Sequence, residues 1–244
     1  MGYCEQIALP EAEPVSLDFV RQRLRLPSSM TQQDTVLTLL IQGARLDAER
    51  ISGLILAQRQ FAQVLDSFPY FTDTIQSQQS YPPNYYSQPR YSTTLWNYSQ
   101  MIKLTKAPLI SVDEFIYIGT DGEPHTLVAG QDFIVDPETK LARIFPMVGQ
   151  QWPACLYTPN AVQIKFTAGY DPDPTAVTTF TSPQDPPNQQ VEYDIVTGIP
   201  ADMQCMIAEL AVWRFQNPGV PGVPAEIERA ISAMGILDFS PTRG

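Results

Sequence analysis

The chain has 244 residues, a formal net charge of −11 at neutral pH and 43% hydrophobic residues. A chain of this length buries one substantial core, or one core and a satellite module, and this hydrophobic content excludes global disorder. The absence of any run of about eighteen apolar residues excludes a membrane span. The acidity argues against general affinity for nucleic acid, because phosphate binding needs clustered Lys and Arg.

A long helix over residues 31–61 is predicted by apolar residues at steps of three and four. This spacing places them along one side of a helix. They are Leu37, Leu40, Ile41, Ala44, Ala48, Ile51 and Ile55. Thr31 is the expected cap, and Asp34 completes an approximate capping box. Because this helix has one apolar side, other elements must cover it.

Gly43 and Gly53 interrupt the long helix, and each weakens it by roughly 1 kcal/mol relative to Ala. Such a cost indicates that a neighbour approaches closely at both positions. Polar residues are expected mostly off the apolar side: Gln42, Arg45, Glu49 and Arg50. A shorter helix, Pro14–Leu24, precedes the long one, and Ser16 is its expected cap.

Residues 70–100 form an insertion rich in Tyr, Ser and Gln, with Asp73 and Arg90 as its charged residues. A loop of this length without periodicity is usually functional or disordered. One interpretation is a floppy polar insertion. Another is an inter-subunit or tail interface, because Tyr and Trp offer large contact areas. A carbohydrate-binding face is the third. The interface hypothesis assigns the contacts to Tyr81, Tyr85, Tyr86, Tyr91, Trp96 and Tyr98.

Residues 101–198 are predicted to form an inserted antiparallel β module. Their short β-branched and aromatic runs are separated by turn signals such as Asp121-Gly122 and Asp136-Pro137. A spacing of roughly ten residues without intervening helices favours a sheet folded on itself. Residues 171–198 are rich in Pro and Thr, and their two β-branched runs predict an extended hairpin.

A second long helix is predicted at about residues 200–217, with Pro200 suited to its first turn. Its apolar side is the expected partner of the 31–61 helix. We expect Leu40 and Leu210 to lie buried in this contact. An Asp at either position would then cost several kcal/mol through a buried, unpaired charge.

The carboxyl-terminal residues 218–244 contain a short helix at Pro224–Met234 and an apolar tail. Pro and Gly residues separate this helix from the rest, and isolated helices below about twelve residues are marginal in water. A short amphipathic helix that enters a partner's groove is a recurrent mode of recognition. The docking hypothesis uses Ile227, Ile231, Met234, Ile236, Leu237 and Phe239. The alternative is that the segment folds back on its own scaffold.

No catalytic motif is present, and no cofactor or metal is expected. His125 is the only histidine and has no second His or Cys at ligand spacing. Glycine-rich phosphate loops, H-E-x-x-H and G-x-S-x-G are absent. Acidic pairs such as Asp171 and Asp173 are interpreted as parts of solvated turns. The three cysteines predict buried thiols of a protein made in a reducing cytoplasm: Cys4, Cys155 and Cys205.

Together these patterns predict an α+β fold. Residues 14–69 and 199–217 form a helical scaffold around the two long helices. Residues 70–100 are the insertion, and residues 101–198 are the β module. Residues 218–244 are a docking helix and tail.

The order of these elements resembles the head-to-tail connector (adaptor) proteins of tailed bacteriophages, over most of residues 15–217. The resemblance rests on packing and turn positions. In the helical part these are Leu17 to Leu26, Asp34, Leu37, Leu40, Ile41, Ala44 and Arg45. In the β part they are Leu104, Pro108, Val112, Tyr117, Asp121-Gly122, Asp132–Asp136, Arg143-Ile144, Trp152-Pro153 and Ala161 to Tyr170. Ile199-Pro200 then opens the second long helix.

This resemblance implies a structural protein of the virion neck, assembled in the host cytoplasm. The expected form is a ring, usually of twelve copies, that attaches to the portal protein and joins it to a stopper or tail protein. The docking helix and tail would bind the portal. DNA would pass non-specifically through the lumen, since an acidic ring does not hold it. The alternatives from other classes are a carbohydrate- or host-recognition module and an acid–base hydrolase using Asp pairs with His125.

Overall fold

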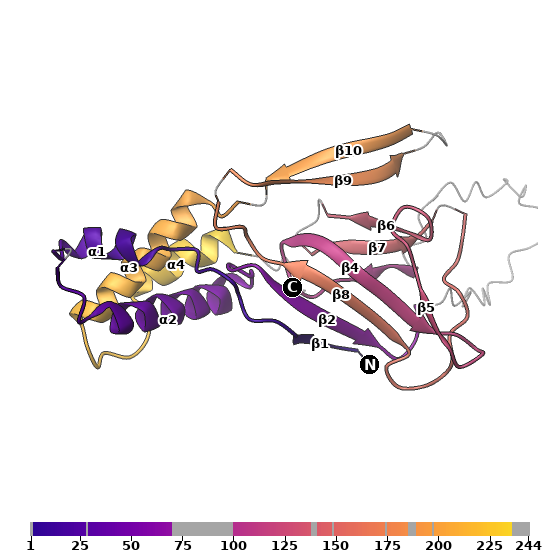
Figure 1. The fold of residues 1–244 in the computed structure, drawn as a ribbon, viewed down its shortest axis with the longest axis horizontal. Coiled ribbons are helices and arrows are strands. Elements are labelled where there is room, and N and C mark those ends of the chain that lie inside the picture. The colour runs from indigo at the N-terminus through magenta and orange to yellow at the C-terminus, as the bar shows by residue number, and fades with distance from the viewer. Residues whose placement is uncertain are drawn as a thin grey trace, which may run out of the picture.

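The computed structural model describes residues 2–27, 29–69, 100–137, 141–147, 149–173, 175–184, 189–196 and 198–235. In this part of the chain, helices gather at one end of an elongated molecule and strands at the other (Figure 1). The helices are α1 Leu17–Leu24, α2 Asp34–Ser52, α3 Ala201–Gln216 and α4 Ala225–Met234. The strands are β1 Tyr3–Gln6, β2 Arg59–Leu65, β3 Ile102–Lys103, β4 Leu109–Ile118, β5 Pro124–Thr126, β6 Phe133–Asp136, β7 Arg143–Pro146, β8 Val162–Ala168, β9 Val177–Gln184 and β10 Gln189–Val196.

Capping residues set the ends of α1 and α2. Ser16 caps α1 by accepting a hydrogen bond from the Phe19 amide at 3.2 Å, as predicted. The predicted helix 31–61 is wrong at both ends. Gln33, not Thr31, is the N-cap of α2 and makes no side-chain cap bond. At the other end Gly53 takes a left-handed conformation, with φ of 72°, and stops the helix.

The helical core lies between α2, α3 and α4. The two predicted long helices therefore pack together, although α2 is shorter than expected. Leu37 and Leu210 are fully buried there, whereas Leu40 is only half-buried and lies outside the core, contrary to the prediction. A Cβ at Gly43 would lie 2.9 Å from Arg214 Nη1, so the expected close neighbour is this α3 side chain.

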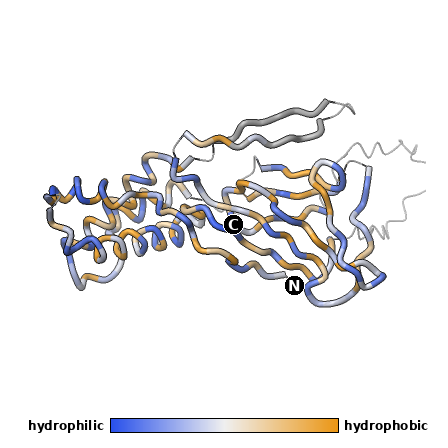
Figure 2. Tube along the Cα trace, in the orientation of Figure 1, coloured by the Kyte–Doolittle hydropathy of each residue, from blue (hydrophilic) through white to orange (hydrophobic). Residues whose placement is uncertain are grey.

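The β end is a sandwich of two antiparallel sheets. One sheet has the order β1-β2-β8-β4-β5, and the other has the order β3-β7-β6. Their facing sides enclose a second core, which includes Phe115 of β4, Phe133 of β6 and Phe166 of β8. Hydrophobic and hydrophilic residues alternate along several strands, as Figure 2 shows and as a half-buried strand requires.

The predicted antiparallel module is therefore confirmed, but it is not limited to residues 101–198. β1 and β2 come from earlier in the chain and complete the five-stranded sheet. Residues 59–65, assigned to the helical scaffold from the sequence, pair with β8 along its whole length. The predicted hairpin is also present, with β9 and β10 paired from Val177↔Val196 to Gln184↔Gln189.

Candidate assembly surfaces

A buried network of charged side chains joins the helical end to the β end. Glu49, near the end of α2, accepts hydrogen bonds from Arg45 Nη1 at 3.1 Å and Arg59 Nη2 at 2.7 Å. It also accepts one from the Leu56 amide at 3.0 Å. Arg45 in turn binds Glu13 at 2.8 Å. Three segments therefore meet at the Glu49 carboxylate: α2, the turn after it and β2. Arg45 links a fourth, the amino-terminal segment that carries Glu13.

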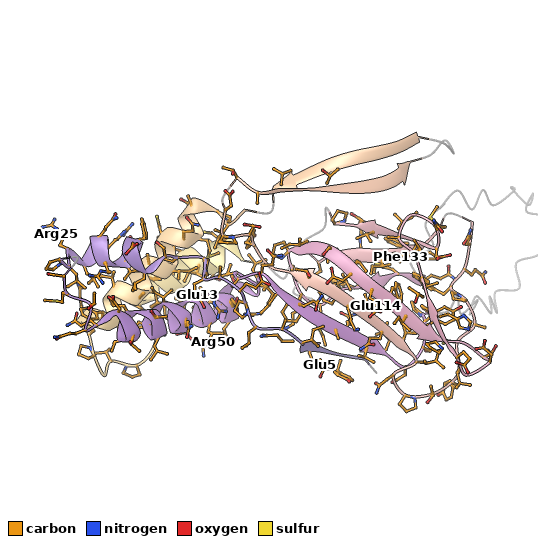
Figure 3. All side chains as sticks on the ribbon, viewed as in Figure 1. Glu5, Glu13, Arg25, Arg50, Glu114 and Phe133 are labelled. Atoms are coloured by element: carbon orange, nitrogen blue, oxygen red, sulfur yellow. The ribbon has the colours of Figure 1, made fainter. Side chains whose placement is uncertain are left out.

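The charges of this network are matched within the protein. Glu49, Arg45 and Arg59 are each less than 10% exposed. Burial acts to lower the pKa of Arg45, but its bond to Glu13 and the charges of Glu49 and Glu13 outweigh burial and raise it. The sequence placed Arg45 and Glu49 off the buried side of the helix, which is wrong. Figure 3 shows Glu13 at the helical end, on the side nearer to the sheets.

The side of α2 that faces away from α3 and α4 carries an apolar stripe. Val36, Leu39 and Leu46 are 50%, 61% and 54% exposed. At about 100° per residue, Leu39 and Leu46 lie roughly opposite the buried Ala44 and Ala48. We call Val36, Leu39 and Leu46 the α2 stripe. Single exposed apolar residues are ordinary, but three along one side of a helix form a candidate contact surface.

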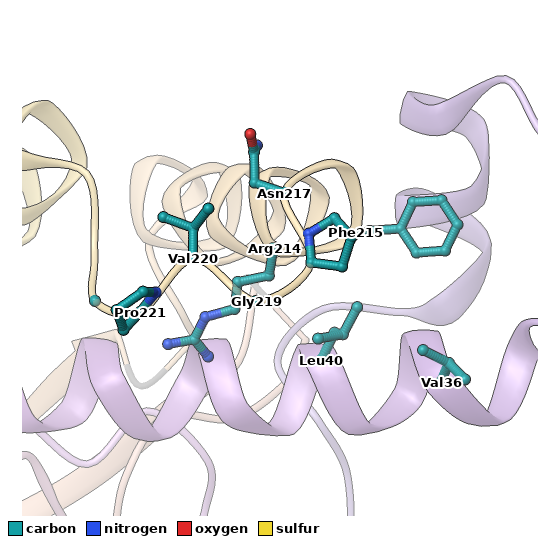
Figure 4. A pocket seen from close by; sticks show the side chains of 10 residues that line it. Val36, Leu40, Arg214, Phe215, Asn217, Gly219, Val220 and Pro221 are labelled. Carbon is teal, nitrogen blue, oxygen red and sulfur yellow. The ribbon is translucent and has the colours of Figure 1, made fainter.

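A groove of about 500 Å³ lies beside the α2 stripe, between α2 and the turn that follows α3. Val36 and Leu40 face this turn from α2, while Phe215 and Val220 lie on the other side (Figure 4). Arg214 crosses the groove to form a salt bridge with Asp47. Burial lowers the pKa of Arg214. The half-exposed Leu40 is thus a groove residue, which explains its absence from the core.

At the β end, Trp152 contacts the chain on both sides of the 70–99 segment, at Phe68 before it and at Gln100 after it. Its indole ring stacks on Phe68, with ring centroids 5.1 Å apart and planes at 9°. Its Nε1–H donates to the Gln100 carbonyl oxygen at 2.7 Å. Phe68 follows β2 at the end of that strand remote from the helices (Figure 1). The segment therefore leaves and re-enters the fold at one tryptophan, far from the α2 stripe.

The titratable residues considered from the sequence serve local structure. Asp121 accepts the amide of Glu123 and the ring N–H of His125, which lower its pKa, and the His125 ring stacks on Tyr117. Asp136 is paired with Arg143. The acidic pairs close turns: Asp171 accepts the amide of Asp173 at 2.8 Å, and Asp173 accepts that of Thr175 at 2.9 Å. Among the described residues, no group of three His, Cys, Asp or Glu side chains is placed to hold a metal.

Two further observations concern residue environments. Cys4, Cys155 and Cys205 are half-buried, rather than buried as the sequence suggested. Within the described ranges no helix combines the length and apolar character that crossing a membrane requires.

The predicted docking and interface residues have mixed outcomes. In α4, Ile231 is fully buried, and Ile227 and Met234 pack against the same helical core. This is the folded-back arrangement that the sequence left as the alternative to a detached helix. Ile236, Leu237 and Phe239 lie outside the described residues. So do the aromatic residues of the insertion: Tyr81, Tyr85, Tyr86, Tyr91, Trp96 and Tyr98.

The sequence prediction missed the α2 stripe. Its signal was present, since Val36, Leu39 and Leu46 recur at steps of three and seven. These residues are left over once Leu37, Ile41, Ala44 and Ala48 are assigned to the buried side. α2 therefore has two apolar sides, a wide one that faces the core and a narrow one that is exposed.

The whole chain has a likeness among solved structures of phage-like particles. It matches a chain in the neck of an empty gene transfer agent (GTA) particle, solved with C6 symmetry, with a TM-score of 0.63 and 14% identity over 99% of this chain and 100% of that one. A chain in the native GTA neck, solved with C12 symmetry, matches with a TM-score of 0.59 and 16% identity over 99% and 100%. A chain of the native GTA virion matches with a TM-score of 0.59 and 15% identity over 95% and 94%. Neither the protein-family models nor the curated proteins gave a match. The likeness shows that the chain has the fold of these neck proteins, as the sequence resemblance implied.

Proposed function

We propose that this chain is a structural protein of the neck of a phage-like virion, where it forms a connector ring between head and tail. The observation that carries the proposal is whole-chain correspondence. The helical end, the sandwich and their connections together match neck chains over 99% of this protein and 100% of those chains. A likeness limited to the sandwich would carry far less, because such sheets serve many functions.

A ring is supported by the symmetry of the neck structures, which were solved with C6 and C12 symmetry. Closed rings require heterologous contacts, in which two different patches of each copy meet. We infer twelve copies around a passage for DNA. At −11 per chain, such a ring is strongly acidic and repels the phosphate backbone, so that DNA slides without being held.

The partners proposed above and below the ring are the portal protein and a stopper or tail protein. We assign portal docking to the carboxyl-terminal segment. Because α4 packs on its own helical core, the assignment falls mainly on the tail after Gly235, with Ile236, Leu237 and Phe239. The aromatic insertion, which joins the fold at Trp152, is the proposed inter-subunit or tail contact.

Particle assembly tests the function directly. Particles produced without this chain should accumulate as separate heads and tails, and restoring the chain should rejoin them. In micrographs, a label on this chain should lie at the neck. Averaged particle images should show the chain as a ring. A normal yield of joined particles without the chain would refute the proposal.

Portal docking has its own comparison. A chain that ends at Gly235 keeps α4 and loses only the tail, whereas a chain that ends at Asn217 loses both. Loss of portal binding in both variants, with stability retained in the first, supports docking by the tail. Undiminished portal binding by the first variant removes that assignment and leaves the neck function standing.

A further inference from the structure

We infer that the α2 stripe is the contact between neighbouring copies in the ring, and that it packs against the outer side of α1 of the next copy. The inference rests on the proposed function, because a second copy is the occupant that a ring supplies. The proposed ring does not say which two surfaces of neighbouring copies contact each other, and this inference names them.

The first observation is where exposed apolar residues lie at the helical end. The large hydrophobic side chains exposed there, among the described residues, are Phe19, Met30, Val36, Leu39, Leu46 and Val220. Half of them belong to one side of α2. Val36 also borders the groove lined by Phe215 and Val220, so the stripe and the groove form one continuous apolar surface.

The second observation is that a different patch lies on α1, which packs against both α2 and α3. In the view of Figure 1, α1 lies along the upper edge of the helical end and α2 along the lower edge. The outer side of α1 presents Phe19, which is 37% exposed and has the Arg23 guanidinium 5.5 Å from its ring centroid. Arg23 is held in place by Glu209 of α3 at 3.0 Å. Two unlike patches, on the exposed sides of two different helices, are what a head-to-tail contact needs to propagate around a ring.

The third observation is that the stripe is rigidly backed. Residues on the other side of α2 are fully buried, and Glu49 ties the helix end to the sheet. Preorganised surfaces lose little conformational entropy on association. The α2 stripe is thus presented without rearrangement of the fold.

Self-association of the full-length chain tests the stripe. Sedimentation velocity across a concentration series should show oligomers of the wild-type chain. Leu39→Glu and Leu46→Glu should each weaken association at least about tenfold, because each places a charge in a desolvated contact. Leu156→Glu, at a 39% exposed leucine of the β end, is the matched control and should associate as wild type. Circular dichroism should show all three variants folded, since each changes an exposed side chain.

Cross-linking tests the pairing of the two patches. In a background with Cys4, Cys155 and Cys205 changed to Ser, chains carrying Leu39→Cys or Phe19→Cys are treated with a short bis-maleimide. A mixture of the two should give a cross-linked dimer, and neither should give one alone. A chain carrying both substitutions should give a ladder of higher oligomers.

The outcomes separate the hypotheses. A wild-type chain that stays monomeric at every concentration overturns the ring and this inference together. Normal association of Leu39→Glu and Leu46→Glu, beside an associating wild type, overturns only the stripe. A dimer formed by Leu39→Cys alone shows an α2-to-α2 contact, which overturns the head-to-tail pairing with α1.

Discussion

Replacing Glu49 with Gln should destabilise the chain more than any exposed charge substitution. The carboxylate accepts three hydrogen bonds in a site where it and both arginines are less than 10% exposed. Removing one partner of a buried ion pair typically costs about 3–5 kcal/mol, because the remaining charge stays buried and unpaired. Arg45 keeps Glu13 at 2.8 Å, so the loss falls mainly on Arg59. We therefore expect the lower half of that range.

Urea unfolding measures this loss of unfolding free energy. The fluorescence of two tryptophans reports unfolding of the two cores separately. Trp152 lies in the β core and Trp213 packs against the helical core. In a Trp96→Phe background each can be retained alone as the fluorescent reporter. Because Glu49 binds both ends, its loss should lower both transition midpoints. A shift seen only by Trp213 would show that the network stabilises α2 without joining the two ends.

Two controls bound the interpretation. Arg50→Ala removes an exposed partner of Asp47 and should cost at most about 1 kcal/mol, as surface pairs do. Glu49→Leu combined with Arg59→Met removes both members of the closest pair and should recover part of the loss, since apolar replacements of buried pairs are often neutral. A loss below about 1 kcal/mol for Glu49→Gln would refute the reasoning.

Three further predictions follow from burial and attachment. Leu210→Asp should cost several kcal/mol in thermal unfolding because Leu210 is fully buried, whereas Leu40→Asp, at a half-buried groove position, should cost clearly less; equal losses would contradict this. Deleting residues 70–99 should leave the melting temperature nearly unchanged but impair oligomerisation or joining to the tail, and a wild-type assembly yield would remove the interface hypothesis. Truncation after Asn217 should lower the melting temperature, because it uncovers the pocket that Ile231 fills; an unchanged temperature would show that α4 adds no stability.

Much of the fold follows from residue patterns, and the misses have identifiable causes. Ser16 gives the start of α1, and the run of β-branched residues gives the hairpin of β9 and β10. β2 was missed because the predicted helix was extended to Phe61, across the first residues of the strand, although Gln60, Phe61, Gln63 and Val64 begin to alternate. The helix itself stops at Gly53, which adopts a left-handed φ. The apolar spacing continues beyond Gly53, so the spacing alone does not show that the helix ends there.

The candidate site was less accessible for a related reason. Polar residues in a helix are assigned to solvent by default. The approach of Arg59 and of the Leu56 amide from other segments helps to make burial of Glu49 tolerable. The α2 stripe was hidden differently. Leu39 and Leu46 lie outside the apolar side assigned from the sequence, and their exposure became evident only in the structure.

The Glu49 network also bears on how a ring closes. A head-to-tail contact generates a closed ring only if each copy is rotated from the last by a fixed angle, and a variable angle yields open chains. The α2 stripe lies at the helical end, while Trp152 anchors the insertion at the opposite end. Contacts at both ends impose the same rotation between neighbouring copies only if the connection between the helical end and the β end is stiff. A carboxylate that binds two arginines and a backbone amide from three segments supplies that stiffness better than apolar packing alone, because hydrogen bonds are directional. On this argument the buried ion pairs fix the angle between the two ends of the molecule, and their role is not to add net stability.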